Sequence, residues 1–207
     1  MAPLLLLLLA LSSLTAALPA EPAPLALGVY YEALCPDSRD FVVDQLNTTY
    51  SRVPEIITPI LVPWGKASVD ADGVISCQHG DEECWGNRLL ACVADAVSAE
   101  AVRVGVISCL MDKQRSLHRD GPACVAAAGL DWEAQTGCAA GDQSYQQALQ
   151  FGQQTDALEP ALTFVPTITL DGSQGSADQQ EALFTDLLNT VCAEWQSRYG
   201  QTPDGCL

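Results

Sequence analysis

The stretch "YYEALCPDSRDF", residues 30–41, decides the fold class of this chain. It lies at the end of an apolar run, residues 25–34, that is rich in strand-forming residues and therefore predicts a buried strand. Pro36 occupies a position typical of the first residue of a helix, and apolar residues follow it at helical spacing. A cysteine between a buried strand and a helix, as at Cys35, is the layout of a thiol-disulfide active site.

Cys35 is the candidate nucleophile of such a site. Attack on a disulfide requires a thiolate, and the unpaired N–H groups of a helix's first turn stabilise that anion. Arg39 adds positive charge nearby, whereas Asp37 opposes it. A dithiol site has a second cysteine three residues after the first, but here that residue is Ser38, whose hydroxyl can donate a hydrogen bond to the sulfur. The alternative is a cysteine that is merely buried beneath the helix.

The rest of the chain predicts a strand over residues 55–65, with prolines at a bend, and then a long helical middle. That middle includes helices at 89–110 and 144–158, linked by cysteine-bearing loops. Residues 163–175, "TFVPTITLDGSQG", predict a strand, an Asp-Gly turn and a short return strand. An amphipathic helix over 176–200 follows, with Ser176 as its N-cap. This order predicts an α/β, thioredoxin-like fold with a helical, disulfide-rich insertion at about residues 66–160.

The first twenty residues contain no charged side chain, and their apolar centre is too short to cross a bilayer comfortably. Small residues follow that centre, so we predict a signal peptide over residues 1–17, cleaved near Ala17, with Ala20 as a second candidate. An uncleaved membrane anchor is the alternative. The mature protein is then a single domain over 25–207 that enters the secretory pathway and has no membrane contact after cleavage.

The sequence "NTT" at residues 47–49 is an N-glycosylation sequon, which has meaning only in a secretory protein. Asn47 lies near the expected end of the helix that follows Cys35. A glycan at that position can point outward, and an ordinary helix-terminal Asn is the alternative.

The net charge of −17 bears on the partners of the protein. It makes nucleic acid and anionic membrane surfaces poor partners. Solubility of a secreted protein is the simplest explanation, and residence in an acidic compartment is compatible with it.

Nine cysteines are present, and an odd number in a secretory protein indicates one free thiol. We predict that Cys35 is free and that the other eight form four disulfides. These eight are Cys77, Cys84, Cys92, Cys109, Cys124, Cys138, Cys192 and Cys206. Their connectivity stays open, except that we expect Cys192 to pair with Cys206, because the two flank a short tail.

Zinc binding is a competing use of some of these cysteines. Cys77, His79, Cys84 and Cys92 offer the ligand types, but their spacing is longer than that of the cysteine pairs in common zinc modules. We therefore predict no metal. No phosphate loop or nucleotide motif is evident, and we predict no cofactor.

The segment "CQHGDEECWGNRLLAC", residues 77–92, resembles the signature of the gamma-interferon-inducible lysosomal thiol reductase (GILT) family residue for residue. The matching residues are Cys77, Gln78, His79, Gly80, Glu83, Cys84, Asn87 and Cys92. The segments "YYEALC", "LVPWGKA", "CAAGD", "QTDAL" and "VPTITLDG" are similar to other parts of the family, so the resemblance covers nearly the whole mature chain.

This resemblance implies a thioredoxin-like fold and the reduction of protein disulfides in acidic endocytic compartments. Cys35 falls on the family's nucleophile. Pro166 falls on a proline expected to be cis, facing the active-site sulfur and presenting backbone to a bound peptide. For His79, Glu83 and Asn87 we expect structural rather than catalytic roles. The resemblance does not decide between residence in the lysosome and residence outside the cell.

Ser38 is the departure from the family pattern, because it replaces the resolving cysteine that would release a bound substrate. We expect a monothiol thiol-disulfide oxidoreductase that acts on disulfide-bonded proteins, with a small-molecule thiol as candidate reductant. The alternative is a catalytically impaired, secreted member that binds peptides or forms adducts. The sequence does not identify the substrates or the oligomeric state of the protein.

Overall fold

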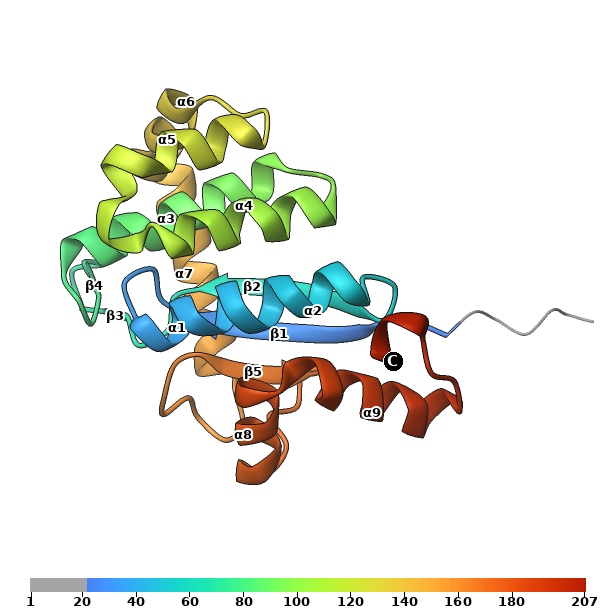
Figure 1. Ribbon diagram of the computed structural model, residues 1–207. Coiled ribbons are helices and arrows are strands. Elements are labelled where there is room, and N and C mark those ends of the chain that lie inside the picture. Colours follow the sequence, from blue (N-terminus) through green and yellow to red (C-terminus); the bar gives the residue numbers. More distant parts are fainter. Residues whose placement is uncertain (1–21) are drawn as a thin grey trace, which may run out of the picture.

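A three-stranded sheet lies at the centre of the computed structural model, which describes residues 22–207 (Figure 1). The middle strand β1, Leu25–Tyr31, pairs in parallel with β2, Ile57–Pro63, and antiparallel with β5, Thr167–Leu170. β1 is buried along most of its length because helices cover both faces of the sheet, as its apolar run predicted. β2 is an edge strand, where prolines are tolerated. The predicted signal peptide, residues 1–17, lies outside the described residues.

One continuous helical segment follows Cys35. It comprises α1, Pro36–Asp40, a π-helical turn η1, Phe41–Leu46, and α2, Asn47–Arg52. Cys35 itself has extended backbone angles (φ −71°, ψ 123°), and Pro36 begins the helix as predicted. The apolar side chains of η1 are buried in the main core, which fixes this segment on the sheet.

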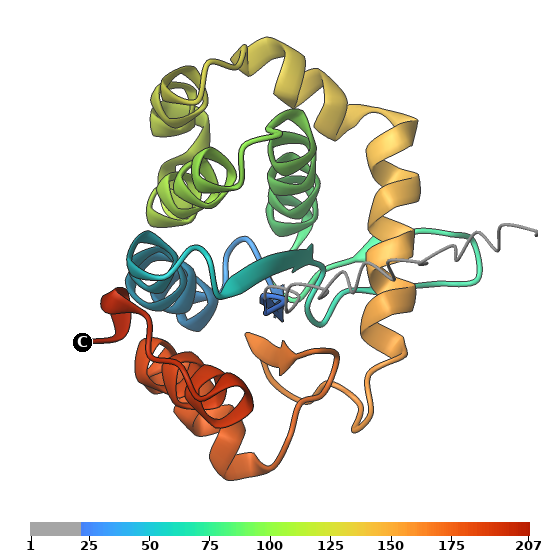
Figure 2. The same cartoon turned by 90° about the vertical axis from the view of Figure 1, so that its right-hand side faces the viewer.

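The helical insertion lies between β2 and β5. It begins with a small hairpin, β3 (Ser68–Val69) and β4 (Ile75–Ser76), and continues as α3 (Asp81–Ala96), α4 (Glu100–Asp112), η2 (Gln114–Ser116), α5 (Leu117–Ala127), α6 (Trp132–Ala140) and α7 (Asp142–Asp156). Figures 1 and 2 show α3 to α6 stacked beyond β2, with α7 on the side of the sheet opposite α1 and α2. None of the helices in the described range 22–207 is long and apolar enough to span a bilayer.

The predicted helix over 89–110 is wrong as a single element. It spans the end of α3 and most of α4, which are separated at Val97, where the backbone is extended (φ −111°, ψ 115°). The cysteine-bearing loops predicted between 110 and 144 are also wrong, because Cys124 lies inside α5 and Cys138 inside α6. Disulfides therefore join the helices of the insertion directly.

The C-terminal part differs from the sequence prediction in two places. The predicted helix over 176–200 is divided at Asp186 (φ −146°, ψ 60°) into α8, Ala177–Thr185, and α9, Leu187–Tyr199. The predicted return strand after the Asp-Gly turn is reduced to one isolated bridge, between Leu170 and Ser173. A short 3₁₀ turn, η3 (Asp204–Cys206), follows α9.

The start of α8 agrees with the sequence prediction. The Ser176 hydroxyl accepts from the Gln179 N–H, and the Gln179 side chain accepts from the Ser176 N–H. This reciprocal capping box satisfies two of the N–H groups that a helix leaves unpaired at its start.

Four disulfides are formed: Cys77–Cys84, Cys92–Cys138, Cys109–Cys124 and Cys192–Cys206. The last is the pair expected from the short tail, and it ties the chain end to α9. The bridges also remove the zinc alternative, because three of its four ligands are consumed in disulfides. Cys77–Cys84 closes the loop that carries His79 and leads into α3.

Candidate active site

Cys35 lies in the turn between β1 and α1, and it is the free cysteine of the described residues. Its side chain is buried, with 7% of the residue exposed, and its Sγ lies 3.8 Å from the carbonyl oxygen of Val165. The Val165–Pro166 peptide bond is cis. The fold therefore brings together two segments that lie 130 residues apart in the sequence, in the arrangement expected for Cys35 and Pro166.

Ser38 is fully buried one turn after Cys35. Its Oγ accepts a hydrogen bond from the Glu32 N–H at 3.3 Å, and no hydrogen bond between Ser38 and the Cys35 sulfur occurs among the described residues. The hydroxyl therefore supports the backbone before Cys35, where the sequence had suggested that it contacts the sulfur.

Arg39 is also engaged away from the sulfur. Its guanidinium donates to Asp40 at 2.9 Å, Asp44 at 3.2 Å and Asp112 at 2.5 Å, which raises the pKa of Arg39 above its usual value. The three carboxylates balance its charge, so Arg39 does not have the supporting role for a Cys35 thiolate that the sequence suggested. It connects the start of the helix to α4 instead.

Side chains from the insertion hold the backbone that leads to Cys35. Asn87 Oδ1 accepts from the Ala33 N–H at 2.8 Å, and Glu83 Oε2 accepts from the Leu34 N–H at 3.3 Å. The Gln114 amide, with its nitrogen facing the loop, donates to the carbonyls of Ala33 and Leu34, both at 3.1 Å. Buried backbone groups need such partners. Glu83 and Asn87 thus act structurally on the loop, as expected.

Glu32, at the end of β1, forms a buried carboxyl pair with Glu83. Both side chains are fully buried, and His79 Nδ1 lies 2.6 Å from Glu83 Oε2 and 3.7 Å from Glu32 Oε2. The Lys66 N–H donates to Glu32 Oε1 at 2.6 Å. The chain can approach this closely because the preceding residue is Gly65 (φ +58°), where a Cβ would lie 2.2 Å from Glu32 Cγ. Burial, together with the nearby Glu83 charge, raises the pKa of Glu32.

The same three side chains are the ones that a cation would contact. One ligand-type atom of each of Glu32, His79 and Glu83 lies within 4.8 Å of the other two. However, Glu83 already accepts from the N–H groups of His79 and Leu34 and from the His79 ring. Hydrogen bonds that hold the loop therefore account for Glu83, whereas Glu32 Oε2 is buried and accepts no hydrogen bond among residues 22–207.

A Glu32→Gln variant tests the charge state of this cluster. Because the pKa of Glu32 is raised in the folded protein, ionisation costs folding free energy as pH rises above the ordinary carboxyl value of about 4.3. We expect Glu32→Gln to be more stable than the wild type at neutral pH and the difference to vanish at about pH 4 and below. Thermal unfolding across this range measures it, and a difference that grows toward low pH would contradict the assignment.

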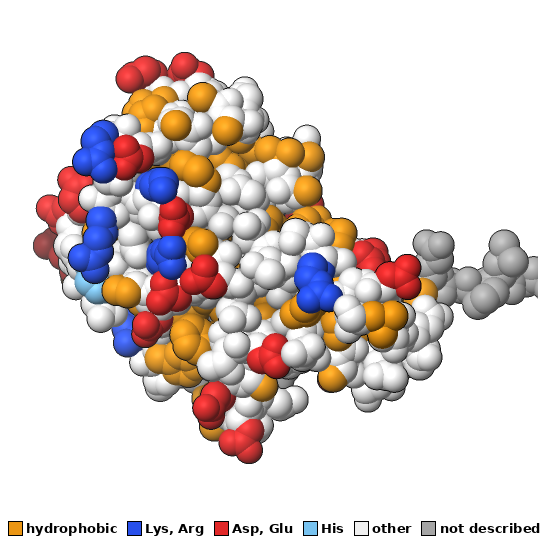
Figure 3. Space-filling view, in the orientation of Figure 1, with side chains coloured by type: hydrophobic (Ala, Val, Ile, Leu, Met, Phe, Trp, Pro, Cys, Tyr) orange, Lys and Arg blue, Asp and Glu red, His pale blue; other side chains and the backbone are white. Residues whose placement is uncertain are grey.

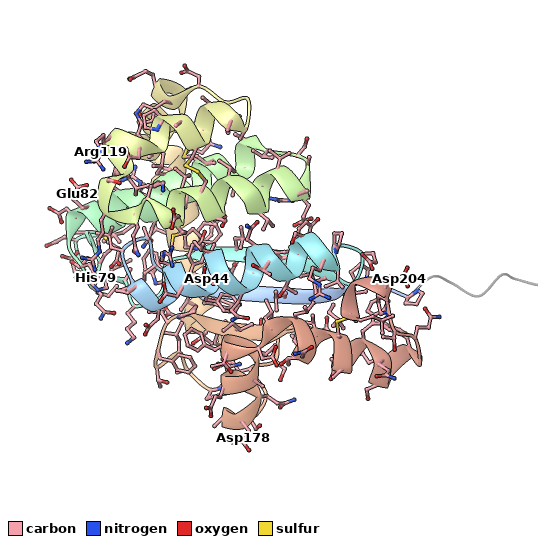
Figure 4. All side chains as sticks on the ribbon, viewed as in Figure 1. Asp44, His79, Glu82, Arg119, Asp178 and Asp204 are labelled. Atoms are coloured by element: carbon pink, nitrogen blue, oxygen red, sulfur yellow. A yellow bond between two sulfur atoms is a disulfide. The ribbon has the colours of Figure 1, made fainter. Side chains whose placement is uncertain are left out.

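Several of these residues were missed from the sequence alone. Glu32 and Gln114 were not singled out, because their partners lie far away in the chain. The available signal was a glutamate inside an otherwise apolar run. Figure 4 shows His79 at the same end of the molecule as the turn between β1 and α1.

Sequence comparison matches this chain to a family of known proteins. Residues 26–128 match the family model described as gamma interferon inducible lysosomal thiol reductase (GILT). The gamma-interferon-inducible lysosomal thiol reductase of Carassius auratus is 32% identical over 189 residues, covering 89% of this chain and 72% of its own. The Mus musculus protein of the same name is 33% identical over 193 residues, with 91% and 74% covered.

Solved structures with a similar fold are also known. Chlamydia trachomatis DsbA has a TM-score of 0.54 at 13% identity, covering 81% of this chain and 88% of its own. Pseudomonas aeruginosa DsbA has a TM-score of 0.53 at 12% identity, with 91% and 93% covered. This likeness confirms the thioredoxin-like α/β class with its helical insertion.

Proposed function

The chain belongs to the gamma-interferon-inducible lysosomal thiol reductase family, and from this premise we propose that it reduces disulfides of protein substrates as a monothiol enzyme. Membership of this family supports thiol-disulfide oxidoreductase activity in this chain. The observation that carries the monothiol form is a free Cys35 at a helix start, beside the cis Pro166 segment, with Ser38 in place of a second thiol.

The first step of the reaction is an attack of the Cys35 thiolate on a substrate disulfide. A bond forms between Cys35 and one substrate sulfur, and the other substrate sulfur leaves as a thiolate that takes up a proton. The product is a mixed disulfide between enzyme and substrate.

The second step needs another thiol. The Ser38 hydroxyl cannot attack the mixed disulfide, and the other eight cysteines are paired with one another. A small-molecule thiol therefore resolves the adduct. In the complete reaction, two molecules of that thiol are oxidised to one disulfide, and one substrate disulfide becomes two thiols.

The substrate side of Cys35 is formed by the segment that ends at Pro166. Phe164, 41% exposed, lies two residues before this proline and lines a hollow of about 430 Å³ with Pro160 and Gln174. Phe164 offers apolar contact to an extended peptide, whereas Val165 and Pro166 are buried beside Cys35. A role for Pro166 in presenting backbone to the substrate stays a prediction, which the cis Val165–Pro166 bond next to the nucleophile supports.

The protein is proposed to act in the secretory pathway, in lysosomes or outside the cell. The support is the signal-like start of the sequence, the four disulfides and the family name. Asn47 lies in the helix after Cys35, which continues to Arg52, and its side chain is half-buried. We propose that it carries a glycan directed away from the sheet.

Trapping the adduct tests this function. We expect mature protein with Cys35 free and its four disulfides intact, mixed with a disulfide-bonded protein, to form a mixed disulfide that persists on a non-reducing gel until a small thiol is added. Cys35→Ala should form none. An adduct that no thiol releases would favour the alternative, a family member that binds peptides or forms adducts without turnover. Native alkylation that labels a site other than Cys35 would contradict the proposal.

A further inference from the structure

An open hollow of about 720 Å³ lies beside the loop that carries Cys35. Leu34, the residue before the nucleophile, lines it, together with Gln114, Arg115, His118 and Arg119 from η2 and α5. The volume lies within the range of small-molecule sites in proteins. The hollow lies on the side of this loop that faces the insertion. The Val165–Pro166 segment, which comes just before β5, contacts the Cys35 sulfur instead.

Basic side chains are concentrated around this hollow, together with the acidic side chains of Glu82, Asp112 and Asp120. The chain has 26 acidic and nine basic residues, yet three of the nine, Lys113, Arg115 and Arg119, lie within seven consecutive residues at this place. Figure 3 shows Lys and Arg side chains, with Asp and Glu side chains among them, at the end of the molecule near the start of α1. In Figure 4, Arg119, Glu82 and His79 lie along that same end.

The ion pairs leave one of these cations available. Lys113 pairs with Asp112 at 2.8 Å and Arg119 with Asp120 at 2.8 Å, while His118 contacts Glu82 at 3.1 Å. Arg115 is exposed and has no ion-pair partner among residues 22–207. A guanidinium without a partner binds carboxylates well, because two of its N–H groups can donate to the two oxygens.

We propose that this hollow binds the small, carboxylate-bearing thiol that resolves the Cys35 mixed disulfide. The inference rests on the proposed monothiol function. Arg115 holds the carboxylate of the thiol. Gln114 fixes the hollow relative to the nucleophile, because its amide is hydrogen-bonded to the carbonyls of Ala33 and Leu34. Binding raises the local concentration of thiol and so replaces part of what a resolving cysteine at residue 38 would supply.

Release of the substrate and recovery of free Cys35 take two thiol-disulfide exchanges. The bound thiol gives up its proton and attacks the Cys35 sulfur, so that a bond forms between this sulfur and the thiol while the bond to the substrate breaks. The substrate sulfur leaves as a thiolate and is protonated. A second molecule of thiol then attacks the first, giving the free disulfide and the Cys35 thiolate. The two thiols supply the two electrons that reduce the substrate.

The test uses thiols that differ in charge. The mature protein is joined through Cys35 to a neutral reporter peptide, and release is followed with 3-mercaptopropionate (anionic), 2-mercaptoethanol (neutral) and cysteamine (cationic). Each rate is divided by the rate of the same thiol on a free peptide disulfide, which removes differences in intrinsic reactivity. We expect the corrected rate of the anionic thiol to be about tenfold above that of the neutral one and to saturate.

Charge variants complete the test. Arg115→Gln should abolish the advantage of the anionic thiol, whereas Arg52→Gln, which makes the same change in net charge at an exposed position on α2, should keep it. Equal corrected rates for all three thiols, or an advantage that survives Arg115→Gln, would overturn the proposal. So would an Arg115 effect seen only on adduct formation with acidic peptides, which would assign the hollow to the substrate.

Failure of the underlying function gives a different result. If the proposed function is wrong, the reporter adduct does not form at Cys35, or it is released without any thiol. If only the binding site is wrong, the adduct forms and all thiols release it with the same corrected rate. The two failures are therefore separated in one experiment.

Discussion

A Ser38→Cys variant is expected to release bound substrate at least about 100-fold faster than the wild type in a single turnover without added thiol. A well-oriented intramolecular nucleophile has an effective molarity on the order of 10⁵ M or more, which far exceeds millimolar free thiol. Formation of the adduct then limits the overall rate, so the observed gain is smaller than the ratio of effective molarity to free thiol concentration. The measurement is the lifetime of the mixed disulfide after rapid mixing and acid quenching.

Ser38→Ala is the matched control for this prediction. Ser38→Cys weakens and Ser38→Ala removes the hydrogen bond that Ser38 Oγ accepts from the Glu32 N–H, which costs about 1 kcal/mol of stability. Only the cysteine supplies a resolving thiol, so Ser38→Ala should keep the long-lived adduct. Equal lifetimes in the wild type and Ser38→Cys would show that residue 38 does not set the rate of release.

The sequence predicted the parts of the site that depend on local signals. Cys35 was identified from a strand followed by a proline, and Ser176 from a capping pattern, and both features need only neighbouring residues. The cis bond at Pro166 was expected only from the family resemblance. The contacts that hold the loop could not be predicted, because Gln114 meets Ala33 across two packed elements. Such a pairing has no periodicity or spacing to reveal it.

The errors in the fold have a similar origin. The breaks at Val97 and Asp186 occur in stretches without Gly or Pro, and neither following helix begins with a side-chain cap. Hydrophobic periodicity therefore seemed to continue across both positions. The chain bends there so that each pair of helices, α3 with α4 and α8 with α9, can pack on different parts of the core. Tertiary packing decides these boundaries.

Side chains of the insertion hold the loop before Cys35 by hydrogen bonds, and Glu83 makes one of them. The side chain is fully buried and accepts from the Leu34 N–H at 3.3 Å, the His79 N–H at 2.9 Å and the His79 ring at 2.6 Å. The Cys77–Cys84 disulfide holds the same turn covalently. α3 therefore fixes the backbone that orients the nucleophile.

Glu83→Ala is expected to lower the free energy of unfolding by about 2–4 kcal/mol, because it leaves buried N–H groups without an acceptor while relieving repulsion with Glu32. Glu82→Ala, on the same turn but with 72% of its side chain exposed, should change stability by less than about 0.5 kcal/mol. Denaturant unfolding with disulfides intact measures both.

Loss of this support should also be visible at the nucleophile. Cys35 is 7% exposed in the intact site, and a loosened loop exposes it more often, so Glu83→Ala should be alkylated faster than Glu82→Ala. Glu83→Gln keeps one acceptor oxygen and should lie between the wild type and Glu83→Ala in both stability and alkylation rate. If Glu83→Ala matched Glu82→Ala in both, the buried hydrogen bonds of Glu83 would not be what orients Cys35.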